Sequence, residues 1–366
     1  MGRGWSDLGG ANGYRSNQTL IPTSQRLSSG SGGRALDPRA AQSIDCENVI
    51  PHPAPNDSLV IPLSTADAPD NRLLGGVISI GNFDGVHRGH ARLIGRLCEL
   101  GERFGGPVVA VTFDPPPGAI LRPRGVPPRL TTLARREELL KACGVSGVVV
   151  IKTSQELLNQ SPEVFFRWLV VGQLQARGIV EGPNFFFGRN RQGNPHLLQR
   201  LSTAAGIECE IVEPTTVDGL MASSTRIREW LIAGDVAAAA ATLTAPYRIR
   251  GRVVAGAKRG RELGFPTANL AEIETLLPAA GVYAGVAHVD GRRHRAAIHL
   301  GPNPTFDDRE AKLEVHLLDY SADLYGRTLD LDFITRVRDV RRFESAAELT
   351  AQLAEDLEAV RAATAA

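Results

Sequence analysis

The hydrophobic pattern of this 366-residue chain changes near Pro246, and the change predicts two different folds. Before Pro246, short apolar runs alternate with helical stretches. The runs are GGVISIG (75–81), VVAVTF (108–113), GVSGVVVI (144–151), ARGIVEG (176–182) and IECEIVE (207–213). Alternation of strand and helix at this spacing predicts an α/β unit with a parallel sheet and helices on both faces. Ligands of such sheets bind beyond the carboxyl ends of the strands.

After Pro246 the chain consists of short apolar runs separated by Gly and Pro turns. The first run is YRIRGRVVAG (247–256) and the last is TLDLDFITRV (328–337). This texture predicts a small antiparallel β-barrel. A helix over Ser224–Leu243 is expected to close the first unit. An amphipathic helix over Ser345–Ala363 is expected to end the chain, and its apolar face carries Leu349, Leu353, Leu357 and Val360.

The first 70 residues differ from the rest. They are rich in Gly, Ser, Asn, Pro and Asp and lack hydrophobic periodicity. Such a segment cannot bury enough apolar surface to offset its ordering entropy, so we expect a disordered extension over 1–70. The domains are then expected at 71–243 and 244–366. The N-terminus lacks the layout of a signal peptide, and no stretch reaches the about 18–20 apolar residues of a membrane span.

Charge and cysteine content restrict the partners of the chain. Lys+Arg number 41 and Asp+Glu 40, so no global field favours nucleic acid or a membrane surface. The oligomeric state stays open. The cysteines lack metal-ligand spacing and predict free thiols in a reducing, cytoplasmic compartment; they are Cys46, Cys98, Cys143 and Cys209.

The segment GNFDGVHRGH (81–90) carries the first chemical signal, because it lies where a strand turns into a helix. His87 and His90 are three residues apart and share a face of the first helical turn. Gly85 and Gly89 let the backbone approach a ligand, and a helix N-terminus presents free N–H groups to phosphate. Two imidazoles there can stabilise charge on a displaced phosphate. The alternative is a pair of surface histidines.

This segment resembles the H-x-G-H signature of the nucleotidylyltransferase superfamily. More narrowly, it is similar to the adenylyltransferase module of bacterial bifunctional riboflavin kinase/FAD synthetases. The resemblance implies a Rossmann-like sheet and catalytic roles for His87 and His90. It also implies that five residues of the segment contact the nucleotide: Gly81, Asn82, Phe83, Asp84 and Gly89.

Two further segments of the first unit resemble the same family. SSTRIR (223–228) is similar to its second ATP motif, so Ser224, Thr225 and Arg228 would meet phosphates. The alternative is a segment that only caps a helix. EGPNFFFGRNRQGN (181–194) resembles the flavin-side loop, which would place Asn184 and Phe185 near the isoalloxazine or its phosphate. The alternative is a packed hairpin.

The second unit contains GAKRGRELGFPTANL (256–270). Its Gly-rich backbone, together with the basic side chains of Lys258, Arg259 and Arg261, suits a polyphosphate. Thr267 and Asn269 offer neutral oxygens to Mg²⁺. A plain β-turn is the alternative. The segment closely resembles the phosphate and magnesium motif of riboflavin kinase. The resemblance implies metal ligation by Thr267 and Asn269, and nucleotide contacts from Gly256, Lys258, Gly260, Arg261 and Gly264.

LEVHLLDYSADLYG (313–326) continues this likeness. The glutamate of the family's E-x-H-L-L-D motif is the catalytic base, which maps onto Glu314. By alternation Glu314 and His316 share a face with Leu318, so we expect Glu314 to point inward among apolar residues. An exposed edge-strand glutamate is the alternative. Arg338 is similar to the family's flavin-contacting end segment.

The resemblance covers roughly residues 75 to 362, with three departures. Pro116 in TFDPPP stands where the family has His, Asn184 where it has Asp, and Val340 where an acidic residue is usual. The family implies that the β-rich unit makes FMN from riboflavin and ATP. The α/β unit then makes FAD and pyrophosphate from FMN and ATP, with Mg²⁺. The alternatives are a single-activity enzyme and a flavin-binding regulator.

Overall fold

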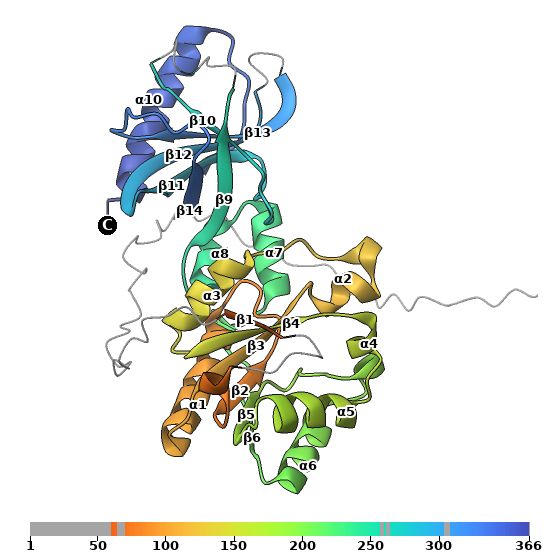
Figure 1. Cartoon of the computed structure of the whole chain (residues 1–366). Helices are drawn as coiled ribbons and strands as arrows, with labels where there is room; N and C mark the ends of the chain where they lie inside the picture. Colours follow the sequence, from red (N-terminus) through yellow and green to blue (C-terminus); the bar gives the residue numbers. More distant parts are fainter. Residues whose placement is uncertain (1–59, 64–69, 257–259, 261–263, 304–307, 366) are drawn as a thin grey trace, which may run out of the picture. The chain divides into compact units, whose positions relative to one another are not determined.

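The first half of the chain folds around a six-stranded parallel sheet (Figure 1). The computed structural model describes residues 60–63, 70–256, 260, 264–303 and 308–365. The sheet has the order β1–β4–β3–β2–β5–β6, and every neighbouring pair is parallel. Its strands are β1 (Val60–Leu63), β2 (Val77–Ile80), β3 (Val108–Asp114), β4 (Gly147–Lys152), β5 (Gly178–Glu181) and β6 (Glu208–Ile211). The predicted parallel α/β sheet is confirmed.

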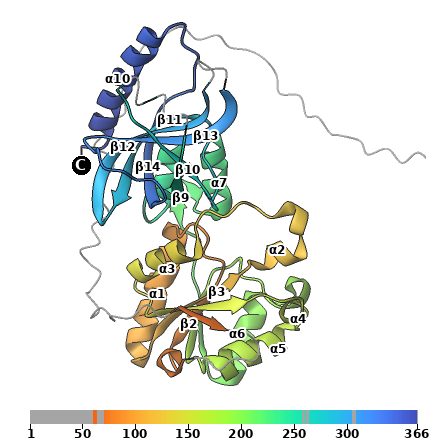
Figure 2. The ribbon, with the colours of Figure 1, turned by 45° about the horizontal axis from the view of Figure 1, so that its top comes forward.

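Helices cover both faces of this sheet (Figures 1 and 2). The helices α1 (Arg88–Phe104) and α3 (Leu133–Ala142) share a buried cluster with one face, to which α1 contributes Leu93, Ile94 and Leu97. The other face packs against α4, α5 and α6, which span Gln155–Leu158, Pro162–Phe166 and Pro195–Ala205. Because both faces are covered, β2 is apolar and buried at nearly every position, as parallel sheets require.

Shorter elements complete this half. A helix α2 (Pro117–Leu121) follows β3, and a small hairpin joins β7 (Thr216–Val217) to β8 (Leu220–Met221). Three single 3-10 turns are η3 (Asn71–Leu73), η4 (Pro123–Gly125) and η6 (Arg189–Arg191), and a π-helix, η5 (Arg167–Gln173), follows α5.

The disordered extension expected over 1–70 is wrong at one point, where the chain forms strand β1. Val60–Leu63 pairs in parallel with β4 and adds an edge strand to the sheet, and Leu63 is fully buried. Four residues among polar neighbours are too few to show a period, so the strand is specified by the edge of β4 that it covers. Most of the remaining extension, 1–59 and 64–69, lies outside the described residues.

The second half is a closed antiparallel barrel, as predicted, with the order β10–β13–β12–β11–β14–β9. The strands are β9 (Tyr247–Val254), β10 (Ala268–Ala271), β11 (Gly281–Val289), β12 (Arg292–Asn303), β13 (Asp308–Leu317) and β14 (Thr328–Arg338). The sequence did not predict β10, because ANLA has no apolar alternation.

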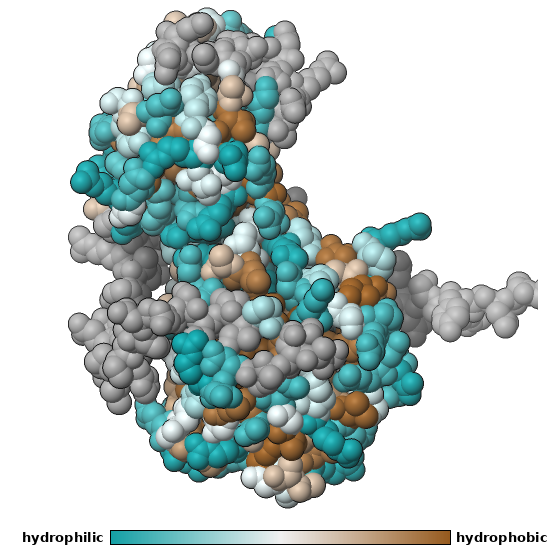
Figure 3. Space-filling model, in the orientation of Figure 1, coloured by the Kyte–Doolittle hydropathy of each residue, from teal (hydrophilic) through white to brown (hydrophobic). Residues whose placement is uncertain are grey.

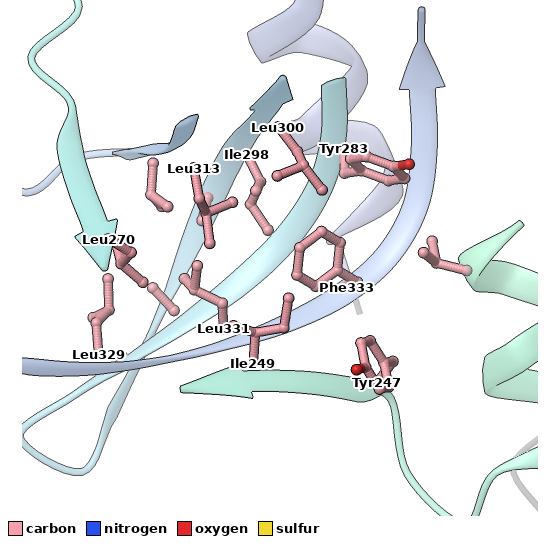
Figure 4. Packing of buried hydrophobic residues seen from close by; sticks show 14 of the residues in the cluster. Tyr247, Ile249, Leu270, Tyr283, Ile298, Leu300, Leu313, Leu329, Leu331 and Phe333 are labelled. Atoms are coloured by element: carbon pink, nitrogen blue, oxygen red, sulfur yellow. The ribbon is translucent and has the colours of Figure 1, made fainter. Parts of the chain in front are cut away.

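Alternate residues of these strands fill the barrel (Figure 4). Along β9, Tyr247, Ile249, Gly251 and Val253 are buried, while the three arginines between them face outward. Phe333 packs edge-to-face on Tyr283 with ring centroids 5.3 Å apart, a preferred aromatic geometry. The core is therefore continuous across the barrel.

The helix expected over Ser224–Leu243 is two helices, so this prediction was wrong at its middle. The first, α7 (Ser224–Ala233), ends at Gly234, which has φ +83° in the left-handed region that favours glycine. Asp235 then caps α8 (Val236–Thr242) by accepting a hydrogen bond from Ala238 N at 2.9 Å. Four residues of these helices belong to the buried cluster that contains Tyr247 and Phe333: Ile227, Leu231, Val236 and Ala239.

The expected C-terminal helix is confirmed as α10 (Ala346–Ala363), capped by Ser345. Val360 is buried against Ala284 and Leu318, and Leu357 packs beside them. No helix in the described ranges is long and apolar enough to cross a membrane. On the face drawn in Figure 3, apolar residues lie in small groups among polar ones, which is ordinary for a folded protein surface.

Candidate active sites

A tight turn carries the chain from β2 into α1 and places the predicted histidine pair at the helix start. Phe83 (φ 47°) and Gly85 (φ +61°) both adopt the left-handed region in this turn. A Cβ on Gly85 would lie 2.6 Å from Leu130 Cδ1, so this position also needs glycine for space. His87 becomes the N-cap of α1, with His90 one turn further.

The two histidines cap the helix reciprocally. His87 Nδ1 accepts a hydrogen bond from His90 N, and His90 Nδ1 accepts one from His87 N, both at 3.3 Å. The rings stack with centroids 3.6 Å apart, and a Cβ on Gly89 would lie 3.1 Å from the His87 ring. Because both Nδ1 atoms accept, the neutral rings carry their protons on Nε2. The pair therefore offers two adjacent N–H donors.

Burial keeps both rings neutral. It lowers the pKa of His87 to about 4. The pKa of His90 lies well below its usual value, chiefly through burial and further through the neighbouring His87 and Arg136. At neutral pH both side chains are thus hydrogen-bond donors without charge, a form suited to oxygen atoms on which negative charge grows.

Asp84 connects this turn to two other segments. Its carboxylate accepts hydrogen bonds from Leu130 N and from Thr131 N and Oγ1, each at 3.0 Å, and it pairs with Arg228. Arg136 Nη2 lies 3.5 Å from Oδ1. The buried carboxylate of Asp84 is bound by protein donors, and its expected nucleotide contact stays a prediction. Asp84 holds the turn in place.

The second motif reaches the same turn. Ser223 caps α7 by accepting from Arg226 N at 3.3 Å, and Ser224 Oγ donates to the carbonyl oxygen of Asp84 at 2.7 Å. Arg228 also donates to the Pro128 carbonyl oxygen at 2.8 Å. Thr225 is exposed on the first turn of α7. The two segments that resemble nucleotide motifs therefore lie together, and capping and a ligand role are compatible.

The flavin-side loop is partly a packed hairpin. Phe187 and Gly193 exchange backbone hydrogen bonds at 3.2 and 2.9 Å, and Phe185 stacks on Phe187 with centroids 5.3 Å apart. Asn184 is exposed beyond the carboxyl end of β5. Glu181 is a buried carboxyl that the sequence did not single out. It accepts from Ile80 N at 2.5 Å, and burial raises its pKa well above the usual value, so it ties the ends of β2 and β5 together.

Glu314 lies in the middle of a row of polar residues across three barrel strands. It faces Asn269 on β10 and His299 on β12 in the strand register. The sequence indicated Asn269 but not His299, whose Nε2 is buried without a hydrogen-bond partner among the described residues. Burial lowers the pKa of His299, although the charge of Glu314 opposes this. A carboxylate and a metal-ligand candidate are therefore adjacent.

The expected inward direction of Glu314 is wrong. Leu313, Val315 and Leu317 fill the barrel interior, so Glu314 and His316 lie on its outer face. The sequence is ambiguous here because Leu317 and Leu318 are consecutive and either could set the alternation. Leu318 lies in the turn after β13 and packs against α10 instead.

Glycines let the loop 256–264 approach the candidate metal ligands Thr267 and Asn269 closely. A Cβ on Gly256 would lie 2.0 Å from Asn269 Nδ2, and one on Gly260 would lie 2.4 Å from the Phe265 carbonyl oxygen and 3.3 Å from Thr267 Oγ1. Gly264 has φ +85°. Lys258, Arg259 and Arg261 lie outside the described residues.

The donor set at this loop suits magnesium bound together with phosphates. Thr267 directly precedes β10 and Asn269 lies within it, and they offer a hydroxyl and an amide oxygen, both hard neutral ligands. Among the described residues, no group of three or more His, Cys, Asp and Glu side chains could hold a metal ion. A cation here would need oxygen atoms from a ligand.

A cavity of about 500 Å³ opens beside Thr267. Its wall includes Tyr320, Leu324 and Tyr325, which sequence reasoning did not assign. The aromatic content of YSADLYG was the available signal. The cavity combines flat aromatic and apolar walls with a polar end, which is typical of a site for a ring-containing small molecule.

The Arg338 side chain binds the C-terminal helix α10. Its Nε and Nη2 bind Asp356 at 2.8 and 2.7 Å, and its guanidinium lies 5.5 Å from the Phe343 ring centre. Asp356 is only 3% exposed. The structure thus places Arg338 as a link between β14 and α10, and the flavin contact that the resemblance implies stays a prediction.

Taken together, these features define a class: a transferase with a nucleotidylyltransferase-type α/β unit and a kinase-type barrel. Residues 70–226 match the family model described as FAD synthetase, and residues 243–364 match that described as riboflavin kinase. The two matches fall on the two halves of the chain.

Individual relatives agree with these matches. The bifunctional riboflavin kinase/FMN adenylyltransferase of Pseudomonas fluorescens is 37% identical, over 80% of this chain and 94% of its own. The Escherichia coli K12 protein of the same description is 36% identical, over 77% and 90%. The chain belongs to the bifunctional riboflavin kinase/FMN adenylyltransferase family. A crystal structure titled macrolide-efflux protein, from Streptococcus pneumoniae, has a TM-score of 0.76 at 32% identity and covers 83% of this chain and 99% of its own.

Proposed function

We propose that this chain phosphorylates riboflavin to FMN and adenylylates FMN to FAD, using ATP in both steps. The observation that carries the proposal is that each half holds its own polar site: the His87–His90 pair in one and the Asn269–Glu314 row in the other. We assign the adenylyltransferase to 71–243, extended by strand β1, and the kinase to 244–366.

In the α/β half, a phosphate oxygen of FMN attacks the α-phosphorus of ATP, and pyrophosphate leaves. The Nε2–H groups of His87 and His90 donate to oxygens that gain charge, and the N-terminus of α1 adds its dipole. The turn 81–90 and the start of α7 bind the nucleotide, with Asn184 and Phe185 on the flavin side. Little covalent help is needed because positioning and charge neutralisation carry such reactions.

In the barrel half, Glu314 accepts the proton of the riboflavin 5′-hydroxyl as its oxygen bonds to the γ-phosphorus of ATP, and ADP leaves. The loop 256–264 binds the phosphates, and Thr267 and Asn269 would hold a magnesium ion. That ion supplies neutralisation of phosphate charge when bound. We assign the cavity beside Thr267 to the adenosine part of ATP, because it adjoins this loop and has tyrosines in its wall.

The test is chromatography of the full chain incubated with Mg-ATP and either riboflavin or FMN. Riboflavin should give FMN followed by FAD, and FMN should give FAD. FMN from riboflavin without any FAD, or FAD from added FMN without any product from riboflavin, would support a single-activity enzyme. Flavin binding without any product would support a regulator and contradict the proposal. A cytoplasmic location remains a prediction from the cysteine content.

A further inference from the structure

Arg136 is a buried arginine beneath the histidine turn that sequence reasoning missed. It lies on α3 and is 5% exposed. Its Nη1 donates to Thr112 Oγ1 at 3.2 Å, and that hydroxyl donates to the carbonyl oxygen of Asn82 at 3.2 Å. Its Nη2 lies 3.5 Å from Asp84 Oδ1. Arg136 thus reaches the first motif directly at Asp84 and, through the Thr112 hydroxyl, at Asn82.

The charges around Asp84 do not balance. Its single carboxylate faces two guanidinium groups, those of Arg136 and Arg228, and all three side chains are at most 16% exposed. The neighbouring pair of Arg129 and Asp114 is balanced, with a 2.8 Å contact. Arg136 Nε also has no hydrogen-bond partner among the described residues. One buried positive charge therefore remains uncompensated, which is costly unless an anion binds nearby.

The uncompensated positive charge lies close to the His87–His90 pair, where phosphate would bind. Arg136 is close enough to His90 to act on its ring electrostatically. The N-terminus of α1, at the same turn, carries the positive end of the helix dipole. The two positive sources therefore reinforce each other at the histidine pair.

We propose that Arg136 supplies a buried positive charge that favours polyphosphate binding at the His87–His90 pair. The ligand class is the triphosphate of ATP and the pyrophosphate that leaves. Arg136 is a positioning residue that acts through the motif turn, and this inference rests on the proposed adenylyltransferase function. The charge count also gives a consequence for folding: without Arg136, Asp84 and Arg228 form a balanced pair, so the fold should persist.

The variant Arg136→Met keeps the length of the side chain and removes its charge. Calorimetry with inorganic pyrophosphate and the full-length protein should show binding weaker by about 10- to 100-fold, as for loss of a charged partner. The melting temperature should stay close to that of the unaltered protein. In FAD synthesis, KM for ATP should rise more than kcat falls. FMN formation from riboflavin should stay unchanged.

Arg135→Met is the matched control. It removes the same charge from the preceding residue of α3, whose guanidinium pairs with Glu138 at 2.9 Å, and should leave pyrophosphate binding unchanged. Arg136→Lys keeps the charge without the planar fork and should bind pyrophosphate within a few-fold of the unaltered protein.

Two results would overturn the inference. One is a folded Arg136→Met protein that binds pyrophosphate within twofold of the unaltered protein. If that variant fails to fold, Arg136→Lys decides: a folded lysine variant whose affinity is reduced about 10-fold or more shows that charge is not the contribution. An unaltered protein that makes no FAD and binds no pyrophosphate would instead contradict the proposed adenylyltransferase function.

Discussion

At His87 and His90, the backbone determines what the side chains can do. Each Nδ1 accepts a main-chain N–H, which leaves Nε2 as the donor, and burial keeps the rings neutral. The H-x-x-H spacing was enough to predict that the pair shares a helical turn. It could not predict the reciprocal caps, because these depend on the path of the preceding turn.

Because burial lowers the pKa of His87, the protein should become less stable as the pH falls from about 6.5 to about 4. The native ring stays unprotonated down to about pH 4, whereas the unfolded chain binds a proton near pH 6.5 and takes up more protons in this window. The loss should be on the order of 3 kcal/mol across the window. Urea unfolding at pH 7 and pH 4 measures it.

His87→Ala is the comparison, because it removes the titrating ring and should show a smaller pH dependence of the unfolding free energy. Glu181, whose raised pKa acts in the opposite direction, contributes to both proteins. An equal pH dependence in the two proteins would mean that the His87 ring titrates normally.

Glu314→Gln should slow FMN formation by about 10²–10⁴, since it keeps the side chain's size and removes its basicity. FAD formation from added FMN should not change, because that chemistry lies in the other fold. The assay compares the two rates in one preparation. A variant that phosphorylates riboflavin at the parental rate would show that Glu314 is not the base.

Two of the residues that prediction missed lie outside the sequence motifs. Arg136 and His299 lie inside an ordinary helix and an ordinary strand, and nothing in their local spacing marks them. Both become evident only when long-range packing places them beside Asp84 and Glu314.

Among the elements, the pattern of apolar runs explains the main success of the prediction, and strand register explains its main error. Apolar runs separated by helices were sufficient for the parallel sheet, and short runs with turns were sufficient for the barrel. The direction of Glu314 was not predictable, because two consecutive leucines left the alternation undetermined and only pairing with β10 and β12 fixes it.

Strand β1 should contribute stability but no chemistry. A protein that starts at Ser58 should melt like the full chain, whereas one that starts at Asn71 should melt several degrees lower, since it loses the buried Leu63 and uncovers the edge of β4. Differential scanning calorimetry of both proteins measures the difference. Equal melting temperatures would show that β1 adds nothing to the fold.

The link between Arg338 and Asp356 should hold α10 on the barrel. Asp356→Ala leaves a partly buried guanidinium without its carboxylate and should lower the unfolding free energy by about 3 kcal/mol. Glu355→Ala, at the exposed neighbouring position of α10, should change it little. Denaturant unfolding of the two variants distinguishes them, and equal losses would contradict this role.

At the scale of the whole molecule, the account rests on two sites in two folds that perform consecutive reactions. The parallel sheet and the barrel have separate polar sites, and the family models match them separately. The product of the barrel, FMN, is a substrate of the α/β half. A substitution that inactivates one site should therefore leave the reaction at the other site unchanged.

The most direct measurement of this claim is a paired assay of both reactions in two variants, His87→Ala/His90→Ala and Glu314→Gln. The double histidine variant should convert riboflavin to FMN at the parental rate and make no FAD. The Glu314 variant should convert added FMN to FAD at the parental rate and make little FMN. If either folded variant loses both reactions, or keeps both, the assignment of one reaction to each half is contradicted.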